Sequence, residues 1–318
     1  MTSQQTDIAL PRRTFLASLP AGVGLAGFAM AEQQASSTLA PRFPHFKPKA
    51  KRFVHLFMNG GPSQVDTWDH KPELTRRHGQ ELPGFDKKTG FFTESVGPLM
   101  KSPFAWAQHG QSGTWVSDLF PQIASVADDL CVIRSMQTEQ INHDTAHAFM
   151  NTGSIIKGRP SMGSWLTYGL GAETQDLPGF IVLTSAGKSG QQPISARQWS
   201  SGVLPSRFQG IQFQSRGDAV HYIGNPDGVC QSTQRQVVDE IARMNGFLGE
   251  QQNDPEIATR IAQYELAFKM QTSVPDLVNF KNEPKEMLDL YGVKEAGDGS
   301  YASNCLLARR LAERGVRM

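Results

Sequence analysis

The architecture is indicated most clearly by the stretch RFVHLFM, residues 52–58, and the turn NGGP, residues 59–62, that follows it. A short, nearly continuous apolar run that ends at a glycine-rich turn is typical of a strand buried on both faces of a sheet. Two further runs have the same character, LCVIRSM at 130–136 and GFIVL at 179–183. We therefore expect residues 52–58, 130–136 and about 179–184 to lie in one mainly parallel sheet.

Helical patterns lie between and after these runs. The spacing of apolar residues predicts helices over 115–128, 161–170, 255–271 and 301–314, the last of them closed by Gly315. Buried strands that alternate with helices indicate an α/β sandwich, with a mainly parallel sheet covered by helices on both faces.

Composition limits the function classes. The chain has 318 residues, of which 39% are hydrophobic, so it can bury a substantial core. Lys and Arg number 31 against 30 Asp and Glu, a balance that argues against a nucleic-acid partner. No apolar run reaches the length of a transmembrane segment. The three cysteines are widely spaced, and we expect buried free thiols instead of a disulfide framework.

The N-terminus has the pattern of an export signal. The pair Arg12-Arg13 precedes a Gly/Ala-rich apolar stretch that ends at Ala29-Met30-Ala31. This order predicts a twin-arginine signal peptide over 1–31, the twin-arginine translocase as a partner during export, and a periplasmic or extracellular location. Residues 32–50 are expected to form a linker, and residues 51–318 the folded domain.

The segment 185–216 contains no acidic residue. It carries Lys188, Arg197, Arg207 and Arg216 among Ser, Gly, Gln and Pro. One interpretation is a solvated surface loop. The other is a segment that crosses over the sheet and faces a bound anion, which its arginines hold by bidentate contacts.

Two polar segments follow the first two predicted strands. After residue 58, Asn59, Asp66 and Asp69 offer hard oxygen ligands for a metal and His70 offers an imidazole, although a plain turn with a helix-capping Asp has the same pattern.

After residue 136, His143 and His147 are four residues apart. Both rings would therefore project from one face of a helix, a spacing that suits a metal or an anion and also occurs in packed cores. Asp144 has two interpretations, a helix N-cap or a base. Because ligands bind beyond the C-terminal ends of parallel strands, we expect the two polar segments to lie side by side.

Five segments together carry a family resemblance: the export signal, FMNGGPSQVDTWDHKPEL, INHDTAHAFMNTG, GRPSMGSWLTYGLG and GQQPISARQWSSGVLPSRFQG. In this order they resemble an uncharacterised, twin-arginine-exported bacterial family within the alkaline phosphatase–sulfatase superfamily. The resemblance covers nearly the whole chain and implies an alkaline-phosphatase-like sandwich.

The resemblance also implies roles for individual residues. Thr152-Gly153 places His143 at the superfamily's nucleophile position, where Ser, Thr or a formylglycine precursor Cys is usual, and His147 at an anion or metal contact. Asn59 stands where a metal-binding Asp is usual, with Asp66 and Asp69 as sources of the missing charge. The superfamily draws further ligands from later strands, so the chain is expected to be truncated at Met318, at the start of such a strand.

Two functions follow from these residues. The first is a metal-dependent hydrolase of sulfate or phosphate esters with zinc, calcium or manganese, in which His143, Asp144 and His147 are catalytic and Arg197 and Arg207 bind the anion. The second is a catalytically inactive relative that binds an anionic glycan or a protein partner on the same face.

Overall fold

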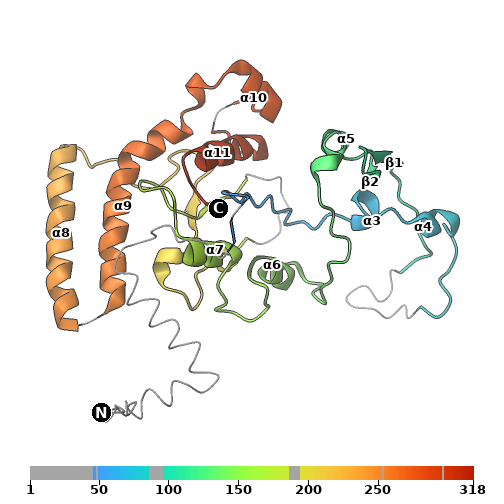
Figure 1. The fold of residues 1–318 in the computed structure, drawn as a ribbon, viewed down its shortest axis with the longest axis horizontal. Helices are drawn as coiled ribbons and strands as arrows, with labels where there is room; N and C mark the ends of the chain where they lie inside the picture. The colour runs from blue at the N-terminus through green and yellow to red at the C-terminus, as the bar shows by residue number, and fades with distance from the viewer. Residues whose placement is uncertain (1–45, 48, 86–95, 186–193, 253, 296) are drawn as a thin grey trace, which may run out of the picture. The chain divides into compact units, whose positions relative to one another are not determined.

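The computed structural model describes residues 46–47, 49–85, 96–185, 194–252, 254–295 and 297–318 (Figure 1). The predicted signal over 1–31 and most of the linker lie outside these residues. The chain divides into two compact units. We call the described residues within 46–53, 163–184 and 204–318 the helical unit, and the described residues within 54–162 and 185–203 the motif unit.

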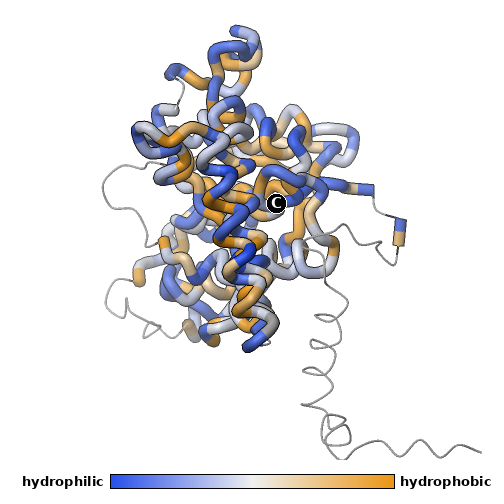
Figure 2. Tube along the Cα trace, turned by 90° about the vertical axis from the view of Figure 1, so that its left-hand side faces the viewer, coloured by the Kyte–Doolittle hydropathy of each residue, from blue (hydrophilic) through white to orange (hydrophobic). Residues whose placement is uncertain are grey.

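Long helices dominate the helical unit. Helices α8 (Gln231–Gln252) and α9 (Pro255–Val278) lie side by side, and hydrophilic and hydrophobic stretches alternate along them (Figures 1 and 2). Helices α10 (Lys285–Tyr291) and α11 (Tyr301–Glu313) follow, with short 3-10 turns η3 (Ser206–Phe208) and η4 (Phe280–Asn282). Helix α7 spans Met162–Leu170, mostly within this unit.

Local chemistry explains where these helices begin and end. The Asp254 side chain accepts a hydrogen bond from the Glu256 N–H at the start of α9. Gly315 follows α11 with a φ of +89°, a conformation that glycine adopts without strain. The helices predicted over 161–170, 255–271 and 301–314 are therefore confirmed, and α9 continues seven residues beyond the predicted end.

The helical unit also contains a small parallel sheet. Strand β3 (Ile181–Leu183) pairs with β4 (Ile211–Phe213), in the register Ile181 with Ile211. On the other side of β3, the Met318 N–H donates to Gly179 O at 3.1 Å and the Ile181 N–H donates to Met318 O at 2.8 Å. This alternation is the hydrogen-bond pattern of parallel neighbours. The expected strand at 179–184 is confirmed, and the fold is mixed helix and sheet.

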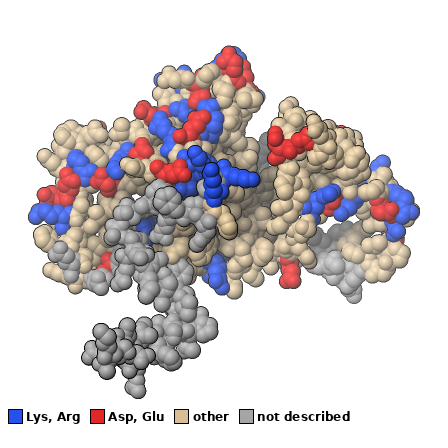
Figure 3. All heavy atoms as spheres, viewed as in Figure 1, with Lys and Arg blue, Asp and Glu red and all other residues tan. Residues whose placement is uncertain are grey.

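The buried core lies in the helical unit. Phe213, Leu277 and Leu306 are fully buried in a cluster to which both strands and α9 and α11 contribute. Acidic and basic side chains are interspersed on the face of this unit seen in Figure 3. No helix among the described residues is long and apolar enough to cross a membrane.

The motif unit is built from short elements. Its helices are α3 (Gln64–Thr67), α4 (Pro72–Arg76), α5 (Pro121–Ala124) and α6 (His143–Thr152), with 3-10 turns η1 (Ala127–Asp129) and η2 (Ala196–Trp199). Strands β1 (Trp106–His109) and β2 (Thr114–Ser117) form an antiparallel hairpin. Gly110 and Gly113 have φ angles of +66° and +64° in its turn, which favours glycine.

The helix predicted over 115–128 is wrong for most of its length. Residues 114–117 form β2, because they pair with β1 across the hairpin turn. The remainder is broken into α5 and η1, with Pro121 at the start of α5. The apolar stripe therefore arises from a strand followed by two separate turns.

Two of the three predicted strands are also wrong. Residues 52–58 and 130–136 form no strand in the part of the chain that the structure describes. In the first run, the Phe53 N–H donates to Arg317 O at 2.9 Å, but no ladder continues from it. In the second, Ile133 and Met136 are 63% and 71% exposed. An apolar run becomes a central strand only where a neighbour pairs with it and both faces are covered.

The cysteines also differ from expectation. All three are free, but Cys131 and Cys230 are exposed and Cys305 is only partly buried. The Cys230 sulfur lies 3.1 Å from the Ser232 hydroxyl and 3.2 Å from the Thr233 hydroxyl. These hydrogen bonds lower the pKa of Cys230 to about 6, because they stabilise the thiolate.

Candidate functional site

Helix α6 carries the two histidines that the sequence singles out. The Asn142 side chain accepts a hydrogen bond from the Asp144 N–H at 3.0 Å and begins the helix. Gly153, with a φ of +71°, ends it. The rings of His143 and His147 are 5.9 Å apart on one face. Asn142 takes the N-cap position, so that interpretation of Asp144 is wrong.

His147 joins α6 to the turn after residue 58. Its side chain is 3% exposed, and its Nε2 donates to the main-chain carbonyl of Asn59 at 2.5 Å. Its Nδ1 accepts from Gln198 Nε2 at 3.5 Å, and the rings of His147 and Phe57 meet edge to face at 5.3 Å. The structure thus brings the two polar segments together through Nε2 of His147, while Nδ1 joins the same ring to the acid-free segment.

Arg197 reaches α6 from the acid-free segment. Turn η2, which begins after the Ser195 cap, packs on α6. Arg197 Nη2 donates to both carboxylate oxygens of Asp144, each at 2.7 Å. The two side chains are 43% and 40% exposed. Asp144 therefore neutralises Arg197 at the surface, in a pair that remains accessible to solvent.

His143 completes this surface. It is the first residue of α6, it is exposed, and it precedes Asp144 directly. An imidazole, a carboxylate and a guanidinium thus lie together at the N-terminal end of a ten-residue helix. We call His143, Asp144 and Arg197 the α6 cluster.

The predicted metal ligands do not assemble. Asp69 pairs with Lys71 at 2.8 Å, and Asp66 lies in the first turn of α3. His70 packs against Trp106 and Trp115, with ring centroids 5.1 and 4.3 Å away. Within the described ranges, no group of three or more His, Cys, Asp or Glu side chains is arranged to hold a metal ion. The residues present therefore do not fit the divalent metal that the superfamily resemblance implies.

Arg207 belongs to the helical unit. It lies in η3, where its guanidinium is 4.8 Å from the centre of the Phe208 ring and 3.5 Å from the Thr259 hydroxyl. These contacts use Arg207 to pack η3 against α9. The eight predicted site residues are consequently divided between the two compact units.

Sequence reasoning missed two residues of this site. Asn142 was detectable, since Asn immediately before a helical pattern is a strong N-cap signal. Gln198 was not, because a glutamine beside Arg197 in an irregular segment has no pattern that points to α6.

Fold and site together define a mixed helix-and-sheet protein with an ion-paired cluster at one helix end. The family model of a protein of unknown function, DUF1501, matches residues 50–318, and the chain belongs to this family. No curated protein and no solved structure matches the chain.

Proposed function

We propose that this chain is an exported, sulfatase- and phosphatase-like protein that binds an anionic ester group, carried on a glycan, at the α6 cluster. The export signal pattern over 1–31 and the resemblance of the sequence motifs to the alkaline phosphatase–sulfatase superfamily support the proposal. The observation that carries it is the exposed Arg197–Asp144 pair at the start of α6.

The energetics of this pair favour exchange of its anion. An ion pair between exposed side chains contributes only about 0–1 kcal/mol. A sulfate or phosphate group offers Arg197 more acceptor oxygens than a single carboxylate does. It would also lie near the positive end of the α6 dipole, which favours negative charge. The Asp144 carboxylate then competes with the ligand for Arg197.

Hydrolysis is the second candidate. It is favoured by the contact between His147 and the Asn59 carbonyl, which joins the two motif segments that the superfamily uses for its site. In this case His143 or Asp144 would serve as base or nucleophile. Arg197 would hold the ester.

The test is binding of a heparin-derived sulfated hexasaccharide to the full chain, measured by calorimetry. Asp144→Asn should tighten binding, since it removes the competing charge and keeps the shape. Arg197→Gln should weaken binding about tenfold or more, equivalent to about 1.4 kcal/mol. Arg159→Gln is the matched control, because it removes an exposed positive charge from the same unit.

Turnover of 4-nitrophenyl sulfate and 4-nitrophenyl phosphate separates the two candidates. Binding without turnover, tightened by Asp144→Asn, supports the inactive binder. Turnover that Asp144→Asn or His143→Gln abolishes supports the hydrolase. Equal binding by all variants, or equal binding of a fully desulfated hexasaccharide, would overturn the proposed site.

A further inference from the structure

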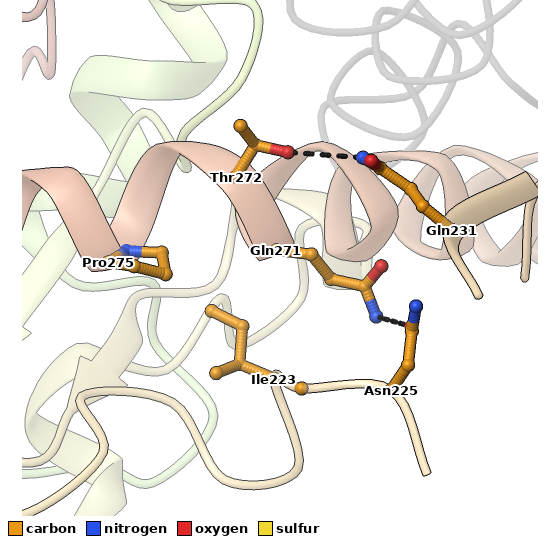
Figure 4. A pocket seen from close by; sticks show the side chains of 7 residues that line it. Ile223, Asn225, Gln231, Gln271, Thr272 and Pro275 are labelled. Carbon is orange, nitrogen blue, oxygen red and sulfur yellow. Dashed lines mark hydrogen bonds between the residues drawn. The ribbon is translucent and has the colours of Figure 1, made fainter. Parts of the chain in front are cut away.

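Helix α8 packs on one side against α9 and is otherwise largely exposed. Among the described elements, α9 is the one that packs extensively against it. Arg235 of α8 donates to the Glu265 carboxylate of α9 at 2.7 Å. At the end of the helix pair seen in Figure 4, the Gln231 amide donates to the Thr272 hydroxyl at 3.4 Å. These contacts fix α8 on α9 and leave most of its other faces to solvent.

An apolar stripe runs along the exposed part of α8. Its members follow one another at intervals of four, three and four residues, which places them on one side of the helix: Val237, Ile241, Met244 and Leu248. We call these four residues the α8 stripe. Ile241 is partly buried, whereas the other three are between 44% and 63% exposed. Hydrophobic positions recur along this helix in Figure 2, which views the helical unit from the side on which α8 lies.

Two exposed aromatic side chains widen the α8 stripe. Phe247 follows Met244 by three residues on the same helix. Tyr264 of α9 lies on the flank of the helix pair opposite to the Arg235–Glu265 contact, because neighbouring helix positions differ by about 100° in direction. The exposed fractions of the stripe and the two aromatics amount to roughly 500 Å² of apolar surface, a size that marks interaction sites on soluble proteins.

We propose that the α8 stripe is the interface of a dimer, in which a second copy of this chain packs its α8 against this one in antiparallel orientation. A twofold axis near the middle of α8 places Val237 of one copy opposite Leu248 of the other. The same axis places Ile241 opposite Met244. Each contact occurs twice across such an axis, so the apolar stripe of one copy covers that of the other.

The charges beside the stripe favour this orientation. Glu240 and Arg243 border the stripe on the side away from α9 and form an exposed pair within α8. The antiparallel arrangement brings Glu240 of each copy near Arg243 of the other, so opposite charges meet twice across the interface. The stripe itself consists of apolar residues, so the dimer buries no unpaired charge at its centre.

The size of the surface also suits a dimer. Because homodimer interfaces are about 65% apolar, roughly 500 Å² of apolar surface corresponds to about 800 Å² of interface on each copy. Stable interfaces of standard size bury about 800 Å² on each partner. The inference does not rest on the α6 cluster, since every residue that it uses belongs to the helical unit.

The test is the mass of the full chain in solution, measured by sedimentation equilibrium across the micromolar concentration range. We expect a mass that rises with concentration and approaches twice the mass of one chain. Met244→Asp places a charge at the centre of the stripe and should raise the dissociation constant about tenfold or more. Leu290→Asp is the matched control, because Leu290 is 75% exposed on α10 of the same unit, and it should leave the constant unchanged. Both positions are exposed, so circular dichroism of the dilute monomers should give the same melting temperature for all three chains.

A mixing experiment tests the antiparallel orientation. Glu240→Lys and Arg243→Glu each place like charges across the interface, so each variant alone should dimerise more weakly than the parent chain. An equimolar mixture of the two should dimerise more strongly than either variant alone. Opposite charges then meet between the copies, whereas the pair within each copy stays broken.

Three results would overturn the proposal. The first is a full chain that stays monomeric across this range or forms oligomers larger than a dimer. The second is a Met244→Asp chain that dimerises as strongly as the Leu290→Asp chain. The third is a mixture that associates no more strongly than its two separate variants, which would contradict the antiparallel pairing.

Discussion

The two compact units bury their apolar residues very differently. In the helical unit, α9, α11 and the parallel strands enclose a continuous cluster around Phe213, Leu277 and Leu306. Among the residues of the motif unit that the structure describes, the buried apolar residues are few, namely Val116, Ala124, Ala127, Pro160 and Trp199. Its apolar runs at 54–58 and 130–136 are largely exposed. The motifs that resemble a catalytic superfamily are thus concentrated in the unit with the smaller core.

This difference changes which interactions matter in each unit. Burial of apolar area dominates stability where a continuous core exists. In the motif unit, individual polar contacts such as those of His147 carry a larger share. The tryptophans allow each unit to be observed separately, since Trp68, Trp106, Trp115 and Trp199 lie in the motif unit and only Trp165 lies in the helical unit.

The largest effect is expected in the helical core. Leu306→Ala should lower the free energy of unfolding of the helical unit by about 2–5 kcal/mol, because it leaves a cavity beneath α11. Guanidinium unfolding followed by far-UV circular dichroism measures this, since the long helices dominate that signal. Ile133→Ala, at an exposed position of the motif unit, should change the free energy of unfolding of the motif unit by less than about 0.5 kcal/mol. Equal losses of unfolding free energy from the two variants would show that the two units do not differ in how much apolar burial stabilises them.

A smaller effect is expected at His147. His147→Phe keeps a ring beside Phe57 but removes the donor to the Asn59 carbonyl, and it should cost roughly 1–3 kcal/mol. Tryptophan fluorescence during guanidinium unfolding reports this loss, since it follows the motif unit. His147→Gln, which retains a donor, should recover part of the loss. If both variants unfold like the parent chain, the His147 contact does not hold the two segments together.

The sequence predicted helices better than strands. Helices α9 and α11 are specified locally, by Asp254 and Gly315 at their ends and by apolar spacing along them. The strand at 181–183 was also recognisable, but the runs at 52–58 and 130–136 have the same composition without a pairing partner. Strand formation depends on residues distant in the sequence, such as the pairing of Gly179 and Ile181 with Met318, and a local pattern does not contain that information.

The candidate site was predicted in part for the same reason. The helical spacing of His143 and His147 is local and is confirmed. The pairing of Asp144 with Arg197 spans 53 residues and was not foreseen. The sequence also placed Arg207 and Asp69 at this site, but Arg207 contacts Thr259 and Asp69 pairs with Lys71. Of the three predicted metal ligands, Asn59 does reach the site, through the contact of its main-chain carbonyl with His147.

The stability of the motif unit should also depend on pH through His55. Burial lowers the pKa of His55 below its ordinary value of 6.5, because desolvation disfavours the charged ring. The unfolded chain then binds more protons than the folded chain below about pH 6.5, so the stability of this unit should fall as the pH decreases through that value. Tryptophan-detected unfolding at about pH 7.5 and about pH 5.5 measures the change. His55→Gln should reduce the pH dependence, and an undiminished dependence would assign it to other groups.

The smallest effect is expected at the Arg197–Asp144 pair. A double-mutant cycle with Arg197→Gln and Asp144→Asn should give a coupling of only about 0.2–1 kcal/mol, and added salt should reduce it. The helical unit offers the matched comparison, because Glu283 receives both Arg309, at 2.8 and 2.9 Å, and Arg310, with much less exposure. Glu283→Gln should cost more, about 1.5–3 kcal/mol, since its hydrogen bonds to charged groups are shielded from water.

A coupling at Arg197–Asp144 as large as the Glu283 effect would mean that the main role of the α6 cluster is to stabilise the fold. A small coupling means that Arg197 exchanges its anion at little cost to the fold, which a ligand-binding arginine requires.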